Sequence, residues 1–223
     1  MKPLLQRADL TPDQAQRAAS HALAWLDNHQ AELSAAHVLG PLLKRTDLTP
    51  ANARRAFAAG ATWLDSYATA AVARFILAPF LIRSEMTAEQ AQRYLVIALA
   101  WLDDHATAHG APLVLRALLA RDDLSVDDMG KAVTGAFAWL DHYAATARAR
   151  YVLAPLLDRT DLGPPAASRA VSLALAWLDA HGSTEKATLV RDALSARSAL
   201  NPVEAHTLTI APAPDRCNTS NPA

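Results

Sequence analysis

Residues 100–105 read Ala-Trp-Leu-Asp-Asp-His, and the triplet Trp-Leu-Asp occurs four more times in the chain. These triplets contain all the tryptophans of the protein, 38 residues apart: Trp25, Trp63, Trp101, Trp139 and Trp177. Cutting the chain at this period gives five blocks that align without a gap: 10–47, 48–85, 86–123, 124–161 and 162–199. A fixed period of about 20 to 50 residues is typical of repeat proteins, whose units stack on their neighbours to bury apolar faces.

Start and stop signals predict two helices in each block. In the first block, Thr11 is expected to cap a helix that runs to about His29, with Pro12 in its first position. Apolar residues at helical spacing predict a second helix over about 34–45. Prolines inside three of the second helices are expected to kink them without breaking them: Pro41, Pro79 and Pro155. Strand signals are absent, so the sequence predicts an all-α fold, an α-solenoid (a right-handed superhelix) of five two-helix repeats.

The two ends of the array differ from its interior. Residues 1–9 match the end of a second helix and are interpreted as a partial repeat or N-terminal cap. In the last block Arg191 and Ser195 replace the leucines found at Leu39 and Leu43, which gives the polar outer face expected of a terminal repeat. Residues 200–223 are expected to form a C-terminal cap and then a disordered tail, because they are short and rich in Pro and Asn.

Composition restricts the classes of partner. The chain has 223 residues with 21 basic and 22 acidic side chains, so its formal charge of -1 gives no basic footprint for nucleic acid. The single cysteine, Cys217, cannot form an intrachain disulfide, and no stretch is apolar enough for a signal peptide or a membrane span. We therefore expect a cytoplasmic protein with neither a nucleic acid nor a membrane as partner.

The Trp-Leu-Asp triplet is interpreted as architecture. Large aromatic residues at helical spacing are more often core than ligand platforms, so each tryptophan is expected to fill the gap between the two helices of its own block. The aspartates end the first helices, where the helix dipole disfavours an anion, and they are expected to accept hydrogen bonds from the start of the second helix. These aspartates are Asp27, Asp65, Asp103, Asp141 and Asp179.

No constellation of residues indicates catalysis. One column holds three histidines and two tyrosines: His29, Tyr67, His105, Tyr143 and His181. Equivalent atoms of stacked helices lie roughly 10 Å apart, so this column cannot converge on one metal ion. There is no glycine-rich phosphate loop and no nucleophile with a base at usable spacing. The sequence predicts a protein that is not an enzyme and that binds no cofactor or metal.

The best candidate for partner binding is a basic column on the first helices. Its members are Arg17, Arg55, Arg93, Lys131 and Arg169. Near them lies a column that varies from block to block: Asn28, Ser66, Asp104 and His142. Uniform charge beside variable polar residues is typical of a groove for an acidic peptide or protein segment. The alternative is a solvated basic face that forms pairs within its own helix.

The two-helix blocks resemble the tetratricopeptide-like class of α-solenoids over residues 3–200, although the period is 38 and not 34 and the Trp-Leu-Asp triplet stands near the end of the first helix. They are also similar to arrays in bacterial multidomain signalling and conflict proteins. The resemblance implies partner recognition on a concave surface, usually lined by the first helices, and no catalytic residue. We therefore expect a non-catalytic scaffold or adaptor; the alternative is a ligand-sensing or regulatory subunit of a bacterial signalling or defence system. Self-association through the N-terminal stretch is left open.

Overall fold

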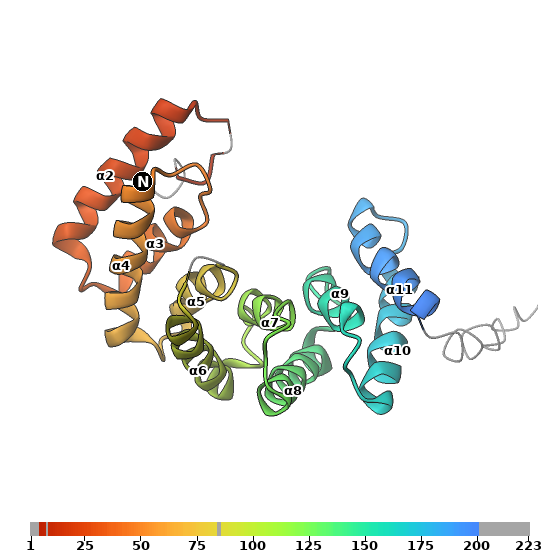
Figure 1. The fold of residues 1–223 in the computed structure, drawn as a ribbon. Coiled ribbons are helices and arrows are strands. Elements are labelled where there is room, and N and C mark those ends of the chain that lie inside the picture. The colour runs from red at the N-terminus through yellow and green to blue at the C-terminus, as the bar shows by residue number, and fades with distance from the viewer. Residues whose placement is uncertain (1–4, 8, 84–85, 201–223) are drawn as a thin grey trace, which may run out of the picture.

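The computed structural model describes residues 5–7, 9–83 and 86–200, and these residues are helical with short turns between helices. The first helices of the repeats are α2 (Pro12–His29), α4 (Pro50–Tyr67), α6 (Ala88–His105), α8 (Val126–Tyr143) and α10 (Pro164–His181). The second helices are α3 (Ala36–Leu43), α5 (Arg74–Leu81), α7 (Pro112–Leu119), α9 (Arg150–Asp158) and α11 (Thr188–Leu200). Successive first helices begin 38 residues apart, and the elements form a solenoid-like series (Figure 1). The predicted all-α solenoid is confirmed.

The first helices begin where the caps predict. Thr11 accepts a hydrogen bond from the backbone N–H of Gln14, whose side chain bonds back to the Thr11 N–H. The same capping box joins Thr87 and Gln90. Each of these pairs satisfies two backbone donors that the helix itself leaves without partners.

The second helices are shorter than predicted. In the first repeat the α-helix covers Ala36–Leu43, and a 3-10 turn over Leu33–Ala35 precedes it. The prolines stand inside α3, α5 and α9, and each helix continues through its proline. The missing N–H of a proline removes one hydrogen bond without ending the helix.

The repeats form a curved array of two layers. In Figure 1 the second helices lie on the inner side of the curve and the first helices on its outer side. Contacts between successive second helices are more extensive than those between successive first helices, as the inner side of a curve requires. At Gly40 the approach is so close that an added Cβ would lie 2.9 Å from the Cβ of Phe75 in the next second helix.

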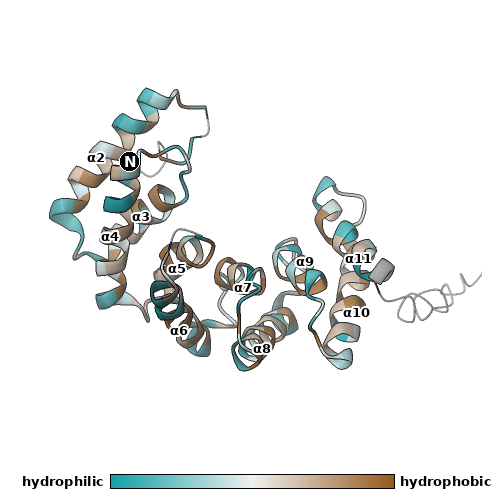
Figure 2. Cartoon of the chain, in the orientation of Figure 1, coloured by the Kyte–Doolittle hydropathy of each residue, from teal (hydrophilic) through white to brown (hydrophobic). Residues whose placement is uncertain are grey.

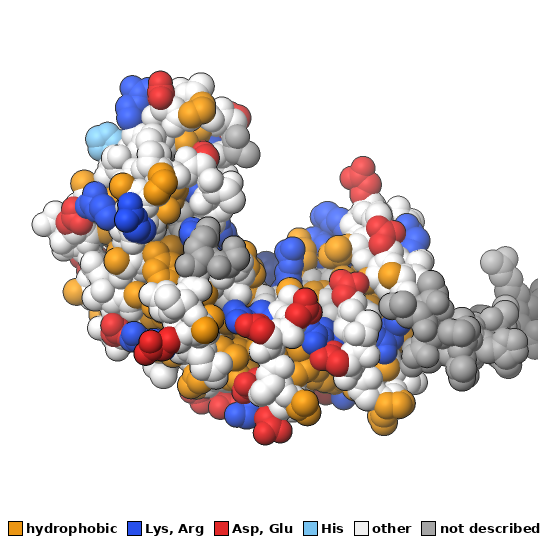
Figure 3. Space-filling model, viewed as in Figure 1, with side chains coloured by type: hydrophobic (Ala, Val, Ile, Leu, Met, Phe, Trp, Pro, Cys, Tyr) orange, Lys and Arg blue, Asp and Glu red, His pale blue; other side chains and the backbone are white. Residues whose placement is uncertain are grey.

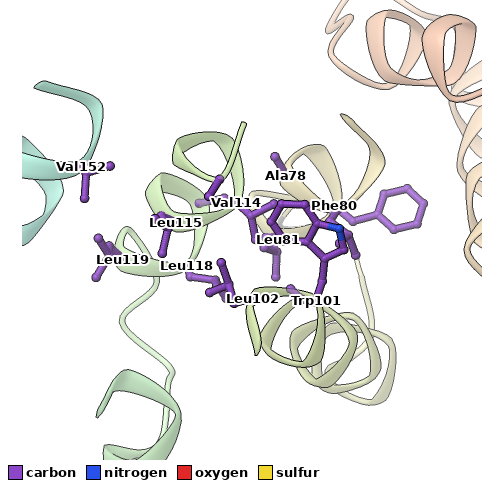
Figure 4. Packing of buried hydrophobic residues seen from close by; sticks show 14 of the residues in the cluster. Ala78, Phe80, Leu81, Trp101, Leu102, Val114, Leu115, Leu118, Leu119 and Val152 are labelled. Atoms are coloured by element: carbon purple, nitrogen blue, oxygen red, sulfur yellow. The ribbon is translucent and has the colours of Figure 1, made fainter. Parts of the chain in front are cut away.

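The buried side chains form one continuous core that extends from Leu5 to Leu194. Figure 4 shows its middle, where α5, α6 and α7 meet. The small column predicted in the first helices is buried throughout: Ala22, Gly60, Ala98, Ala136 and Ala174. Hydrophilic residues gather at helix ends, for example at both ends of α2 (Figure 2).

The ends of the array continue its bonding pattern where they are described. Arg45 donates to the backbone carbonyls of Leu5 and Arg7, so the N-terminal stretch packs on the first repeat. Arg191 and Ser195 are exposed on α11. The predicted tail lies outside the described residues, as do residues 1–4 and 8 of the N-terminal cap. None of the helices described is both long and apolar enough to cross a membrane.

Candidate binding surface

The tryptophan side chains join neighbouring repeats. Trp101 in α6 donates its indole N–H to the carbonyl of Ala70, 2.9 Å away in the turn between α4 and α5. The corresponding bonds run from Trp63 to Glu32, from Trp139 to Ala108 and from Trp177 to Thr146, at 3.0, 3.1 and 2.8 Å. Each acceptor lies 31 residues before its tryptophan, in the preceding repeat.

The position of the ring matches a place at a three-helix junction. Figure 4 shows the Trp101 indole above α6, between α5 of the preceding repeat and α7 of its own. The ring is 1% exposed and stacks on His105 with centroids 4.6 Å apart. Trp25, by contrast, is half-buried, and its indole N–H has no acceptor among the described residues. The sequence analysis did not foresee the bond to the preceding repeat, since no period within one block reveals it.

The aspartates of the triplets bind arginines of the following repeat. Arg55 donates to both carboxylate oxygens of Asp27, at 3.1 and 3.0 Å. Arg93 forms the same pair with Asp65, and Arg169 with Asp141. The predicted hydrogen bonds to the start of the second helix are replaced by these pairs, because the end of one first helix lies beside the next first helix. Asp103 and Lys131 face one another in the sequence pattern but form no ion pair, and Asp179 is exposed.

The structure therefore pairs two columns that the sequence analysis treated separately. Three of the five basic residues predicted to bind a partner neutralise aspartates of the array itself. Arg17 and Lys131 are exposed without a carboxylate, and Arg17 helps to line a pocket of about 300 Å³ with Leu10 and His21. The variable residues are exposed toward the ends of the first helices: Asn28, Ser66, Asp104 and His142. Opposite charge and equal regularity are the signal that could have identified the pairing.

A second set of arginines joins the ends of the second helices. Arg121 donates to the carbonyl of Leu81 in the preceding second helix at 3.0 Å and also binds Asp123. Arg159 makes equivalent bonds to Arg121 and to Asp161. The hydrogen bond from Arg159 holds the pKa of the Asp161 carboxyl below its ordinary value. Their regular position is therefore explained by cohesion between repeats.

The inner layer carries side chains that the array itself does not neutralise. We call the exposed and half-buried side chains of α3, α5, α7, α9 and α11 that point away from the first helices the concave surface. One column runs along its middle, with a side chain from every repeat: His37, Phe75, Leu113, Tyr151 and Leu189. Figure 3 shows this side hollowed between the two ends of the array, with Lys and Arg side chains beside the hollow.

Three arginines lie along this column. The guanidinium of Arg74 lies 4.3 Å from the centroid of the Phe75 ring, and that of Arg150 lies 4.2 Å from the Tyr151 ring. Arg116 approaches the same tyrosine from α7, at 5.9 Å. No carboxylate of the described part of the chain lies within 4 Å of these three guanidinium groups.

Two of these arginines are held in the same way. Arg74 donates to the carbonyl of Ala71 and Arg150 to that of Ala147, each three residues earlier in the turn between the helices. The side chain of Arg74 also covers Gly110, where an added Cβ would clash with its Nε atom. Burial lowers the pKa of the Arg74 guanidinium below its ordinary value.

The sequence analysis missed this surface because it examined the second helices only for their buried stripe. The signal was present in the positions opposite that stripe, which hold large or charged residues in most blocks. At its N-terminal end the surface includes a pocket of about 560 Å³ lined in part by His37, Pro41, Lys44 and Phe75. Within the described ranges, no three His, Cys, Asp or Glu side chains are grouped so that they could hold a metal ion.

Comparisons with protein-family models, with curated proteins and with solved structures find no match. The chain is a helical repeat protein with ten helices at a regular spacing of about 38 residues, and no family is identified. Its function must therefore be argued from its own surfaces.

Proposed function

We propose that the protein is a non-catalytic scaffold that holds a segment of another protein on its concave surface. The observation that carries this proposal is the contrast between the two layers. On the outer layer, most charges of the regular columns neutralise one another across repeats. On the inner layer, aromatic, apolar and basic side chains of successive repeats remain in part exposed along one column.

The exposed apolar side chains of this surface support a protein partner. Leu113 and Leu189 are 37% and 46% exposed, and Ile82, directly after α5, is 68% exposed. Contiguous apolar side chains rimmed by polar ones are typical of interaction surfaces. The resemblance to tetratricopeptide-like arrays also implies recognition on the concave surface, which here belongs to the second helices.

The proposal is tested by comparing two double variants in affinity purification from the native host. I82S/L113S alters the concave surface, and V96S/L175S alters exposed apolar residues of the first helices, where Val96 is 56% and Leu175 36% exposed. Both variants replace exposed side chains, so both are expected to fold.

We expect I82S/L113S to lose the proteins that the wild-type chain retains, and V96S/L175S to keep them. Equal retention by both variants would exclude the concave surface as the binding site. Circular dichroism of both variants checks that any loss does not come from unfolding.

A further inference from the structure

We propose that the segment bound on the concave surface is acidic, and that Arg74, Arg116 and Arg150 bind its carboxylates while the rings of Phe75 and Tyr151 receive its apolar side chains. This inference rests on the proposed function, because it assigns a chemistry to the partner of the same surface. It goes beyond it in naming the charge that the partner must carry.

The first argument is the fixed position of two guanidinium groups. Arg74 and Arg150 occupy the same place in their repeats, 76 residues apart, and each is held by a turn carbonyl and by the face of a ring. A guanidinium that is already ordered loses less conformational entropy when it binds an anion. Planar guanidinium groups also match the two oxygens of a carboxylate.

The second argument is the absence of a counter-ion. The arginines that join the repeats have carboxylates of this chain as partners, as Arg93 has Asp65 and Arg159 has Asp161. Arg74, Arg116 and Arg150 have none within 4 Å in the described ranges. Arg74 is in addition partly buried, and this burial disfavours its charged form. An anion supplied by a partner compensates that cost.

The spacing of these groups defines the length of the segment. Packed helices lie about 10 Å apart, so α5 and α9, with α7 between them, span roughly 20 Å. An extended chain rises about 3.3 Å per residue, so about six residues connect Arg74 with Arg150. Leu113 of α7 lies on the same column between the two rings, where it can contact an apolar side chain of the segment.

The distribution of charge favours a polypeptide over a nucleic acid. Asp158 and Asp192 are exposed on α9 and α11, so acidic groups interrupt the basic residues of the inner layer. A nucleic acid presents a continuous row of phosphates and requires a continuous basic track. An acidic segment with apolar residues between its carboxylates requires only separate basic positions.

The test is fluorescence anisotropy with three labelled probes and the full-length chain. The first probe is a peptide of about 12 residues built from Glu-Glu-Leu repeats, long enough to reach all three arginines. The second replaces every Glu by Gln, and the third is an oligouridylate of equal length. The variant R74Q/R116Q/R150Q is compared with R17Q/R54Q/K131Q, which removes three exposed charges from the first helices.

We expect the Glu probe to bind the wild-type chain more tightly than the Gln probe or the oligouridylate. Loss of three exposed charge contacts should weaken Glu-probe binding about tenfold in R74Q/R116Q/R150Q. The variant R17Q/R54Q/K131Q should bind within about twofold of the wild type, because the measured contribution of a remote exposed charge is small.

Three results would overturn the inference: equal binding of the Glu and Gln probes, a greater loss in the first-helix variant, or tighter binding of the oligouridylate. Failure of the acidic chemistry differs from failure of the proposed function. In the first case I82S/L113S still loses its native partners although the Glu probe does not bind. In the second case both double variants retain those partners.

Discussion

A single indole N–H explains why the Trp-Leu-Asp triplet recurs. A donor buried with its ring must find an acceptor, because an unpaired polar group away from water costs free energy. The acceptor for Trp101 is the Ala70 carbonyl, which belongs to the preceding repeat. The residue therefore has no complete environment inside its own block, and its regular recurrence follows from the contact between blocks.

Replacing this tryptophan should destabilise the array more than replacing the terminal one. W101F removes the bond to Ala70 and leaves unfilled volume, and we expect a loss of about 2 kcal/mol in the free energy of unfolding. W25F removes an indole that is half-buried and without an acceptor in the described residues, so we expect less than about 1 kcal/mol. Urea denaturation of both variants measures the difference, and equal losses would contradict the role assigned to the bond.

Acid should weaken the contacts at the ends of the second helices. Arg159 lowers the pKa of the Asp161 carboxyl below its ordinary value, mainly through their hydrogen bond. A carboxyl with a lowered folded-state pKa stabilises the fold above its unfolded pKa of about 3.9, and this contribution is lost as the pH falls through the folded value. We expect D161N to reduce the fall in stability below about pH 4, and to cost less than about 1 kcal/mol at pH 7 because the pair is partly exposed.

The control for this pH experiment is D104N. Asp104 is exposed and belongs to no ion pair of the described residues. Its removal should leave the acid limb of the stability curve unchanged. If D104N and D161N flatten that limb equally, general charge repulsion and not the pair with Arg159 governs it.

The residue scale also shows the limit of the sequence. The identity of the conserved-spacing columns, such as Asp65 and Arg93, is visible in the sequence, but their pairing depends on which helices become neighbours. Pattern within one block predicted a partner for Asp65 at the start of the next helix. The structure gives that carboxylate to Arg93, 28 residues later, because first helices pack side by side.

At the scale of elements, one helix pair differs from the others in a compensating way. The second repeat has Gly60 where the other first helices have alanine, and Phe80 where three second helices have leucine. A Cβ added to Gly60 would lie 2.9 Å from the Cζ atom of Phe80. The larger ring therefore requires the smaller residue.

A double-mutant cycle measures this compensation. G60A should destabilise by about 1 to 2 kcal/mol through overpacking, reduced by the better helix propensity of alanine. F80L should cost about 1 kcal/mol through a cavity. The double variant G60A/F80L restores the pattern of the other repeats, and we expect it to be more stable than the sum of the single losses implies. Additive losses in urea denaturation would show that the two positions do not compensate.

Helix existence and helix starts could be predicted from the sequence because their signals are local. Thr87 and Gln90 form a capping box that needs no tertiary information. The assignment of the inner layer could not be predicted, because it depends on how closely whole helices approach. The contact between Gly40 and Phe75 is part of that approach, and it joins residues of different repeats.

At the scale of the molecule, the protein is an open array without a central core. Every repeat contacts its neighbours, so the ends have fewer contacts than the middle. Stability of such arrays is approximately a sum of repeat and interface contributions, and terminal units open more readily. The open curve leaves the concave surface accessible along its length (Figure 3).

This architecture predicts a gradient of amide hydrogen exchange. Backbone amides of α5, α6 and α7 should exchange more slowly than those of α2 and α11, because the central helices have neighbours on both sides. Mass spectrometry of exchanged peptides measures this gradient. Equal protection from end to end would indicate a single cooperative unit, which an array joined only through neighbours does not form.

The most direct test of the account is hydrogen exchange of the five indole N–H groups, followed by NMR. If the tryptophans join neighbouring repeats, four indoles should exchange slowly: those of Trp63, Trp101, Trp139 and Trp177, each bonded to the preceding turn. The indole of Trp25, which has no acceptor in the described part of the chain, should exchange fast. Equal protection of all five, or fast exchange of any of the four, would contradict the claim that these rings hold the repeats together.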